Sequence, residues 1–246
     1  MSLRKVQRLS LVQQTVETLR EMINSGAYDN VDRLPSEEQL AAEIGASRLT
    51  VREALAVLEG EGVIMRRHGK GTMINYRTRQ LKARIDPARE IGRFIAESGF
   101  QPGVARVKGW WEPAGVILAK KLGLKPEDKV LVIEKLFLAD GNPAVFCIDR
   151  IPEKLIKTPI PEARYWETIF TVLEEHSGIH VVSDIVELIP TTADHRLAAI
   201  MKVNPGTPLL QLDTVAFDEQ NEPVMATQEY YLDTFVRFTL YRKANY

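Results

Sequence analysis

Hydrophobic residues near the start of the chain recur at the spacing of a helix. Between residues 10 and 25 the apolar positions are Val12, Val16, Leu19 and Ile23, which fall on one face at 3.6 residues per turn. This stripe predicts an amphipathic helix that ends at Gly26.

Two shorter helices are predicted next. Ser36 is followed three residues later by Gln39, the spacing of a capping box, and Gly45 limits that helix to about two turns. Ser47 can cap a third helix that runs to about residue 60. Its inward face carries Val51, Ala54, Leu55 and Leu58. Two helices joined by a short glycine-containing turn predict a helix-turn-helix.

The pattern changes after Gly62 to two short apolar runs. Residues 63–67 and 72–75 predict strands, which the basic sequence His68-Gly69-Lys70-Gly71 connects. A basic hairpin after a helix-turn-helix is a wing, so residues 8–76 are predicted to form a winged helix.

The second half of the chain alternates strand-like and helical segments. Residues 77–89 are expected to form a linker, because the sequence around residues 76–84 is polar and basic with no apolar period. Strands are predicted at 105–112, 130–139, 144–150, 180–190, 209–217, 224–231 and 236–241, and helices at 87–100, 115–122, 166–176 and 192–201. Residues 90–246 therefore predict an α+β domain with a mostly antiparallel sheet.

The runs at 133–137 and 210–217 are similar to each other, and hairpins lie near both. This similarity suggests a weak internal duplication. Chance is the alternative.

Composition adds to these predictions only when the charges of the two parts of the chain are counted separately. The 246 residues are 45% hydrophobic and 26% charged, which excludes a disordered or low-complexity chain. The formal net charge of −1 argues against a nucleic-acid partner. Residues 1–84, however, hold 14 basic and 10 acidic side chains, an excess of +4, and the remainder has an excess of −5. The basic front module is therefore the part expected to meet an anionic partner.

Cysteine use and hydropathy predict where the protein works. Cys147 is the single cysteine and cannot form an internal disulfide, which fits a reducing cytoplasm. No run approaches the roughly 18 apolar residues needed to span a bilayer. The first ten residues lack the apolar core of a secretory signal. These features predict a cytoplasmic protein that has no membrane partner.

The third predicted helix carries basic side chains away from its core face. Arg48 and Arg52, one turn apart, can bind guanine edges or phosphates near the helix N-terminus, where the dipole favours anions. Ser36 and Thr50 can donate hydrogen bonds to phosphates. The wing adds Arg67, His68, Gly69 and Lys70. An isolated arginine pair would favour a solvated helix face, but the capped turn before it and the basic hairpin after it favour DNA.

A series of motifs spans this module: Leu34-Pro35-Ser36-Glu37, Gly45-Ala46-Ser47-Arg48, Thr50-Val51-Arg52-Glu53-Ala54-Leu55, Glu61-Gly62 and Gly69-Lys70-Gly71-Thr72. The series closely resembles the winged helix of GntR-family bacterial transcription regulators. The resemblance implies that Arg48, Thr50, Arg52 and Gly69 contact DNA.

Two positions depart from the family pattern. Glu38 stands where the family usually has arginine, and Leu49 stands where it often has threonine. A carboxylate near a phosphate is unfavourable, so Glu38 implies weaker binding or a different operator preference. Leu49 can instead contact a thymine methyl group.

A second series of motifs covers about residues 90–242 and includes Leu122-Gly123-Leu124, Asp140-Gly141-Asn142-Pro143, Pro208-Leu209-Leu210 and Tyr230-Tyr231-Leu232-Asp233. Its order after a winged helix resembles the HutC branch of GntR regulators, whose C-terminal UTRA domain is similar in fold to chorismate lyase and binds a small-molecule effector. The resemblance implies a homodimer on an inverted-repeat operator in double-stranded DNA, repression as the usual outcome, and no cofactor.

The resemblance also implies an effector site. Carried over position by position, its residues are Lys135, Phe137, Cys147, Thr168, Phe170, Glu229, Tyr231 and Arg237, and the helix start near Gly92 and Arg93 can add backbone donors for an anion. Sugar-phosphate-binding relatives have arginines where Lys135 and Phe137 stand and a glutamate where Cys147 stands. Loss of a bidentate donor and an acceptor predicts a less phosphorylated, partly apolar effector that keeps one anionic group, which Lys135 or Arg93 would bind.

The second module offers no catalytic or metal site by its residues alone. His176 and His180 lack metal-ligand spacing, because Gly178 interrupts any helical pairing of the two, and His195 stands apart. Cys147 alternates with apolar residues and fits a buried position better than a nucleophile. We therefore expect no enzyme and no metal. The alternatives are a chorismate-lyase-like enzyme and a ligand-independent DNA-binding protein whose pocket is filled by side chains such as Phe137.

Overall fold

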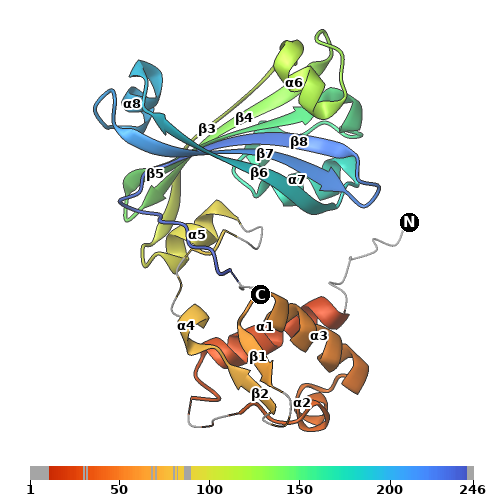
Figure 1. The fold of residues 1–246 in the computed structure, drawn as a ribbon. Helices are drawn as coiled ribbons and strands as arrows, with labels where there is room; N and C mark the ends of the chain where they lie inside the picture. The colour runs from red at the N-terminus through yellow and green to blue at the C-terminus, as the bar shows by residue number, and fades with distance from the viewer. Residues whose placement is uncertain are drawn as a thin grey trace. The chain divides into compact units, whose positions relative to one another are not determined.

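The computed structural model describes residues 11–29, 31, 33–67, 69, 71–79, 81, 83–85 and 90–242. The chain divides into two compact units, and each is treated by itself (Figure 1). The first unit comprises residues 1–86 together with 239–246, and the second comprises residues 87–238. The last eight residues thus group with the N-terminal module, although the sequence patterns had assigned them to the C-terminal one.

The first unit has the elements of a winged helix. They are α1 (Leu11–Asn24), α2 (Glu37–Ile44), α3 (Arg48–Gly60), β1 (Ile64–Arg67), β2 (Gly71–Ile74) and the short α4 (Tyr76–Arg79). Strands β1 and β2 pair antiparallel and form the predicted hairpin. One apolar core joins α1 to α3, with Leu19, Leu55 and Leu58 almost fully buried.

Local side-chain chemistry sets the ends of α2 and α3. The backbone N–H of Gln39 donates to Ser36 Oγ at 3.2 Å, and the N–H of Ser36 donates to Gln39 Oε1 at 2.9 Å. Gly45 ends α2 in the left-handed conformation at φ 75°. Ser47 caps α3 through the N–H of Thr50. The predicted capping box is therefore confirmed, as is the inward face of α3.

The second unit is one six-stranded antiparallel sheet with helices. Its elements are α5 (Ile91–Glu97), β3 (Pro102–Pro113), α6 (Gly115–Leu122), β4 (Lys129–Ala139), β5 (Asn142–Pro152), η1 (Glu153–Leu155), η2 (Glu162–Arg164), α7 (Ile169–Ser177), β6 (Val181–Thr192), α8 (His195–Met201), β7 (Pro208–Asp218) and β8 (Pro223–Tyr231). The strand order is β3-β4-β5-β8-β7-β6. The predicted α+β class is confirmed.

The order of elements repeats within this unit. The series α5-β3-α6-β4-β5 is followed by α7-β6-α8-β7-β8, and β4 and β7 are the central strands of the two three-stranded halves. The two similar runs at 133–137 and 210–217 lie in these two strands. The topology therefore supports the internal duplication.

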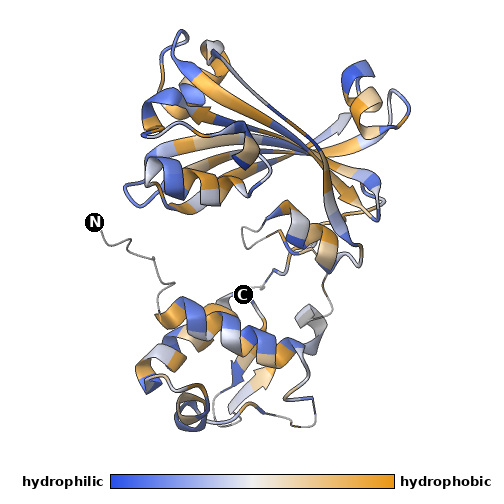
Figure 2. Cartoon of the chain, turned by 180° about the vertical axis from the view of Figure 1, so that it is seen from behind, coloured by the Kyte–Doolittle hydropathy of each residue, from blue (hydrophilic) through white to orange (hydrophobic). Residues whose placement is uncertain are grey.

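Helices cover both faces of the sheet, so its central strands are buried on both sides (Figure 1). Val132 and Phe146 pack in a core that includes α8, whereas Ile133 packs with α7 on the opposite face. Figure 2 shows the hydrophobic residues concentrated along the strands. Strands that are buried on two faces have near-continuous apolar sequences, which explains the run in β4.

Some predicted boundaries were wrong. Residues 236–241 are not a strand of the sheet, because the chain leaves the sheet after β8 and Thr239 makes only an isolated bridge to Arg84. Helices α7 and α8 start later than predicted, because Thr168 and Asp194 cap them and so fix their first turns.

Candidate functional site

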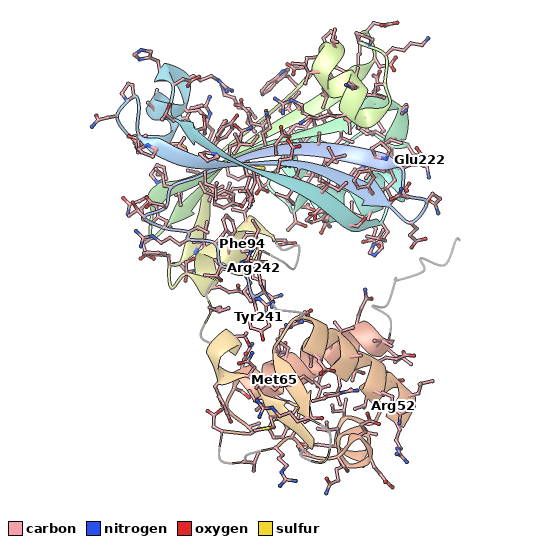
Figure 3. The ribbon with its side chains drawn as sticks, in the orientation of Figure 1. Arg52, Met65, Phe94, Glu222, Tyr241 and Arg242 are labelled. Atoms are coloured by element: carbon pink, nitrogen blue, oxygen red, sulfur yellow. The ribbon has the colours of Figure 1, made fainter. Side chains whose placement is uncertain are left out.

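The outer face of α3 carries the side chains expected for DNA recognition. Leu49 is 62% exposed, and the Arg52 side chain is 57% exposed. Arg48 is exposed one turn before Arg52. Figure 3 shows Arg52 on the outside of the first unit. Two guanidinium groups and an apolar side chain thus project from the N-terminal half of this helix, the part that contacts bases in helix-turn-helix proteins.

A carboxylate that the sequence patterns did not single out orients Arg52. Glu37 Oε2 accepts from Arg52 Nε at 3.0 Å and lies 3.0 Å from Arg52 Nη2. This hydrogen bond raises the pKa of Arg52. The pair joins the first turn of α2 to α3, so Glu37 positions the guanidinium before any DNA is bound. In the sequence, Glu37 is only a glutamate in the first turn of a predicted helix. That position does not specify how far its side chain lies from α3.

Arg66 ties the wing to α3. Its Nη2 donates to the Arg52 carbonyl at 3.2 Å, and its backbone N–H donates to Glu59 Oε1 at 3.2 Å. Arg67, by contrast, is exposed and pairs across the hairpin with Gly71. Gly69 has a φ of 73° and no atom within 4 Å of where a Cβ would lie, so the hairpin tip is open. His68 and Lys70 lie outside the described residues.

Hydroxyl groups stand at the N-termini of α2 and α3. Ser36 is exposed, and Ser47 Oγ shares a 2.7 Å hydrogen bond with Thr50 Oγ1. Both helix ends offer the partial positive charge that attracts phosphate. Glu38 is exposed in the first turn of α2, where the same charge stabilises a carboxylate. This location gives Glu38 a structural role in α2.

The second unit holds a buried group of polar side chains on the face of the sheet that packs against α7. Lys135 on β4 pairs with Cys147 on β5, which pairs with Glu229 on β8. The group, called the polar cluster below, consists of Lys135, Cys147, Asp149, Thr227, Glu229 and Tyr231. The sheet register thus brings together four of the predicted effector-site residues.

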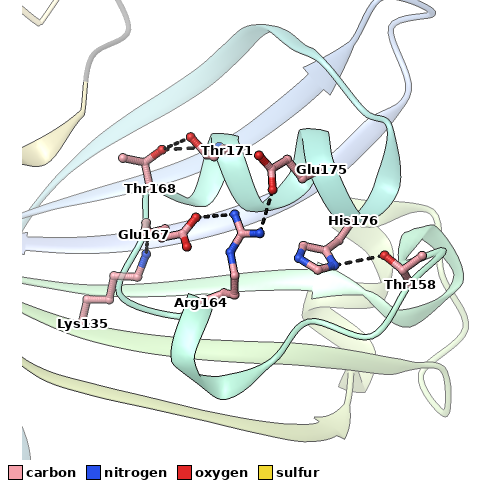
Figure 4. A network of polar contacts seen from close by, with 8 residues as sticks. All are labelled: Lys135, Thr158, Arg164, Glu167, Thr168, Thr171, Glu175 and His176. Atoms are coloured by element: carbon pink, nitrogen blue, oxygen red, sulfur yellow. Dashed lines mark hydrogen bonds and ion pairs between the residues drawn. The ribbon is translucent and has the colours of Figure 1, made fainter. Parts of the chain in front are cut away.

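The side chains of the polar cluster have hydrogen-bond partners both inside the cluster and just outside it. Thr227 Oγ1 donates to Asp149 Oδ1 at 2.9 Å, and Tyr231 OH donates to Glu229 Oε2 at 2.7 Å. Lys135 Nζ donates to the Glu167 carbonyl at 2.6 Å (Figure 4). The ammonium group of Lys135 is therefore held by a backbone oxygen just before α7.

Burial sets the protonation of the cluster. Removal from water raises the pKa of Asp149 and raises the pKa of Glu229 to about 7. Burial and the nearby Asp149 carboxylate raise the pKa of the Cys147 thiol well above its usual value. A thiol held protonated is a poor nucleophile, which fits the predicted filler role.

The other predicted effector residues have different surroundings. Phe137 lies two residues from Lys135 on β4. It pairs across the sheet with Val145 on β5, which in turn pairs with Tyr231 on β8. Phe170 packs against the core under α7. Arg93 pairs with Glu97 within α5, which also contains Gly92, and Arg237 bonds to Asp233. The side chains of both arginines are largely exposed, so they do not join the buried cluster.

A network before and within α7 fixes the carbonyl that holds Lys135 (Figure 4). Arg164 bonds to the Glu167 carboxylate and to Glu175 Oε2, the latter at 2.7 Å. His176 Nδ1 lies 3.0 Å from Thr158 Oγ1. Thr168, a predicted effector residue, caps α7 through Thr171. These contacts hold the Glu167 segment close to the cluster.

The described part of the chain holds neither a metal-binding group of side chains nor a membrane-spanning helix. No group of three or more His, Cys, Asp or Glu side chains within it is arranged to hold a metal ion. None of its helices is long and apolar enough to cross a membrane.

Comparison with known proteins gives two family matches. Residues 11–74 match the model of bacterial regulatory proteins of the gntR family, and residues 97–235 match the UTRA domain. The HTH-type transcriptional regulator RB1450 of Rhizobium meliloti is 27% identical over 220 residues, or 88% of each chain. The HTH-type transcriptional repressor NagR of Bacillus subtilis is 25% identical over 217 residues, again 88% of each chain.

A solved structure has the same fold. The possible transcriptional regulator YydK from Bacillus subtilis superposes with a TM-score of 0.74 at 16% identity, covering 96% of this chain and 100% of that chain. The likeness extends over both units.

Proposed function

Because this chain belongs to the GntR family of bacterial regulatory proteins that carry a UTRA domain, the HutC-like group, we infer that it is a DNA-binding transcription regulator modulated by an effector. From that membership we propose that it acts in the cytoplasm as a homodimer, represses its target operon, and binds an inverted-repeat operator through α3 and the wing. The repressor NagR among its relatives supports this sign of regulation. The observation that carries the DNA-binding surface is the exposed Arg48–Arg52 face of α3 beside Glu37.

The operator proposal is tested by selection of duplexes from a random library with the full chain. We expect an inverted repeat whose half-sites are bound by two α3 helices, together with an affinity that falls steeply with salt. A selected sequence without two-fold symmetry would contradict the proposed arrangement.

Arg52→Ala is expected to weaken binding to the selected duplex by about 1–3 kcal/mol and to relax sequence preference at one base position. The reason is loss of a guanidinium that Glu37 already holds in place. Gel-shift titration measures the change, and Val57→Ala, further along α3 and 43% exposed, is the matched control. Equal affinities of Arg52→Ala and the unmodified chain would show that α3 does not contact the bases.

We assign the proposed dimer contact to β6. In the described sheet this strand lies at one edge, so its outer N–H and C=O groups are not part of a ladder. It also exposes three large apolar side chains, Val182, Ile185 and Leu188, each at least 53% accessible. Pairing of two β6 strands about a two-fold axis would satisfy these backbone groups and place the exposed side chains of β6 beside those of the partner strand.

A double substitution tests this contact. Ile185→Lys with Leu188→Lys is expected to convert the dimer to a monomer in sedimentation velocity, because lysines on each strand would repel those on the partner strand. Trp111→Lys, an exposed position on the opposite edge strand β3, is the matched control. Dissociation by the Trp111 change instead would place the interface on β3.

We propose that the polar cluster forms part of the effector site. Lys135 is its cation and Phe137 is an apolar neighbour on the same strand, which supports a partly apolar effector with one anionic group. Burial raises the pKa of Glu229 to about 7, so this carboxyl is only partly ionised at neutral pH and repels an anion less. Thermal-shift screening of metabolites tests the class, and stabilisation by sugar phosphates alone would contradict it.

We also propose that the second unit has no catalytic activity. In support, Thr227 donates to Asp149 and Tyr231 donates to Glu229 within the polar cluster, and the Cys147 thiol is held protonated. Turnover of a stabilising ligand that is lost on Lys135→Ala would favour the enzyme alternative. Operator release that responds to no metabolite would favour a ligand-independent DNA-binding protein.

A further inference from the structure

The chain segment after β8 is anchored in the second unit by buried apolar groups. Leu232 and Val236 are 6% and 2% exposed. The Phe238 ring meets Phe94 edge-on at a centroid distance of 5.1 Å and meets Tyr231 at 4.8 Å. Tyr231 is the member of the polar cluster that donates to Glu229. Phe238 therefore rests directly on the proposed effector site.

The next residue belongs to the first unit. The N–H of Thr239 donates to the Ala83 carbonyl at 3.1 Å, and the N–H of Ile85 donates to the Thr239 carbonyl at 3.1 Å. These two bonds form a parallel bridge around Arg84. Ala83 is fully buried. Thr239 is thus held by the backbone that follows the winged helix.

Two residues later, Tyr241 covers Gly62. A Cβ placed on Gly62 would lie 2.3 Å from Tyr241 Cε1 and 2.4 Å from Cδ1, so the ring occupies the space of a side chain there. Gly62 is buried and has a φ of 73°. Both the backbone conformation and the ring therefore require glycine at this position.

Gly62 lies at the junction of the recognition helix and the wing. One residue, Glu61, separates it from the end of α3, and one residue, Val63, separates it from the start of β1. Its carbonyl accepts from Asn75 Nδ2 at 2.9 Å and from Thr78 Oγ1 at 2.8 Å, so it also fixes the chain after β2. Figure 3 labels Tyr241. A shift of this ring would act on α3, the wing and the segment after the wing together.

We propose that residues 236–242 are a strap that couples the effector site to the recognition helix, in addition to the linker at 77–89. One series of contacts runs from Glu229 through Tyr231 and Phe238 along the strap to Tyr241 on Gly62. An effector that moves Tyr231 moves the base of the strap, and the other end of the strap holds the end of α3. This proposal depends on the proposed function in one respect, the assignment of the polar cluster to the effector site.

Hydrogen exchange of the full chain tests the contact of the strap. Tyr241→Ala is expected to speed amide exchange at residues 62–64 and 75–78 several-fold, because Gly62 loses the ring that covers it and local opening becomes easier. Leu240→Ala is the matched control, because Leu240 is the preceding strap residue and is 57% exposed. Unchanged exchange in Tyr241→Ala would overturn the proposal.

A double-mutant cycle tests the coupling. Tyr231→Phe removes only the hydroxyl that bonds to Glu229, and it is expected to change exchange at residues 75–78 in the otherwise unmodified chain. The same change made in Tyr241→Ala should have no effect there, because the strap no longer transmits it. Additive effects, or no effect of Tyr231→Phe in either background, would overturn the coupling. Neither measurement uses DNA or effector, so failure of the operator proposal would leave both results interpretable.

Discussion

Leu58→Ala is expected to destabilise the first unit by about 2–5 kcal/mol and so to abolish operator binding, while the second unit stays folded. Leu58 lies fully buried in the core that joins α1, α2 and α3, and the described residues of that core all belong to the first unit. A cavity there reduces the packing that holds α3 in place. Thermal unfolding of the full chain, followed with amide exchange in each unit, measures the change.

The same helix provides the control. Leu49→Ala removes the same atoms from a side chain that is 62% exposed, so its unfolding free energy should stay within about 0.5 kcal/mol of the unmodified chain. Its operator affinity then tests the expected thymine-methyl contact without a change in stability. If Leu58→Ala destabilised the second unit equally, the two units would not fold independently.

The sequence predicted those parts of the fold that local chemistry decides. Ser36 with Gln39, and Ser47 with the glycine before it, set the ends of α2 and α3 because a cap needs only nearby backbone groups. The apolar period of α3 identified its buried face. The six strands of the sheet were predictable for the same reason, since alternation and turn residues are local signals.

Contacts that depend on register or on distant segments could not be predicted this way. Glu37 meets Arg52 only because α2 and α3 cross at that point. Lys135 finds the Glu167 carbonyl across a separation of 32 residues. The prediction of a strand at 236–241 was wrong for a related reason. An apolar run does not specify which strand it pairs with, and Thr239 pairs with the backbone around Arg84 instead of with the sheet.

Glu229→Gln is expected to flatten the dependence of the second unit's stability on pH. The pKa of Glu229 is raised to about 7 in the folded chain, mainly by burial, from an ordinary value of 4.5. Below pH 4.5 the carboxyl is protonated in both the folded and the unfolded chain, so its full contribution to the stability of the folded chain is present. Between pH 4.5 and 7 the unfolded chain releases the proton first, so stability falls as pH rises through this window and levels off above it. The total fall is about 3 kcal/mol, because each pKa unit corresponds to about 1.36 kcal/mol.

Denaturant unfolding at a series of pH values measures this slope. Glutamine keeps an oxygen that can accept from Tyr231 OH, so the variant removes the titration and retains the hydrogen bond. Asp149, whose pKa burial also raises, leaves a residual fall in the variant. Glu222→Gln, in the exposed turn before β8 (Figure 3), should keep the unmodified profile. A slope in Glu229→Gln as steep as in the unmodified chain would mean that Glu229 is solvated, and the polar cluster would then not be the dry surface on which the proposed effector site depends.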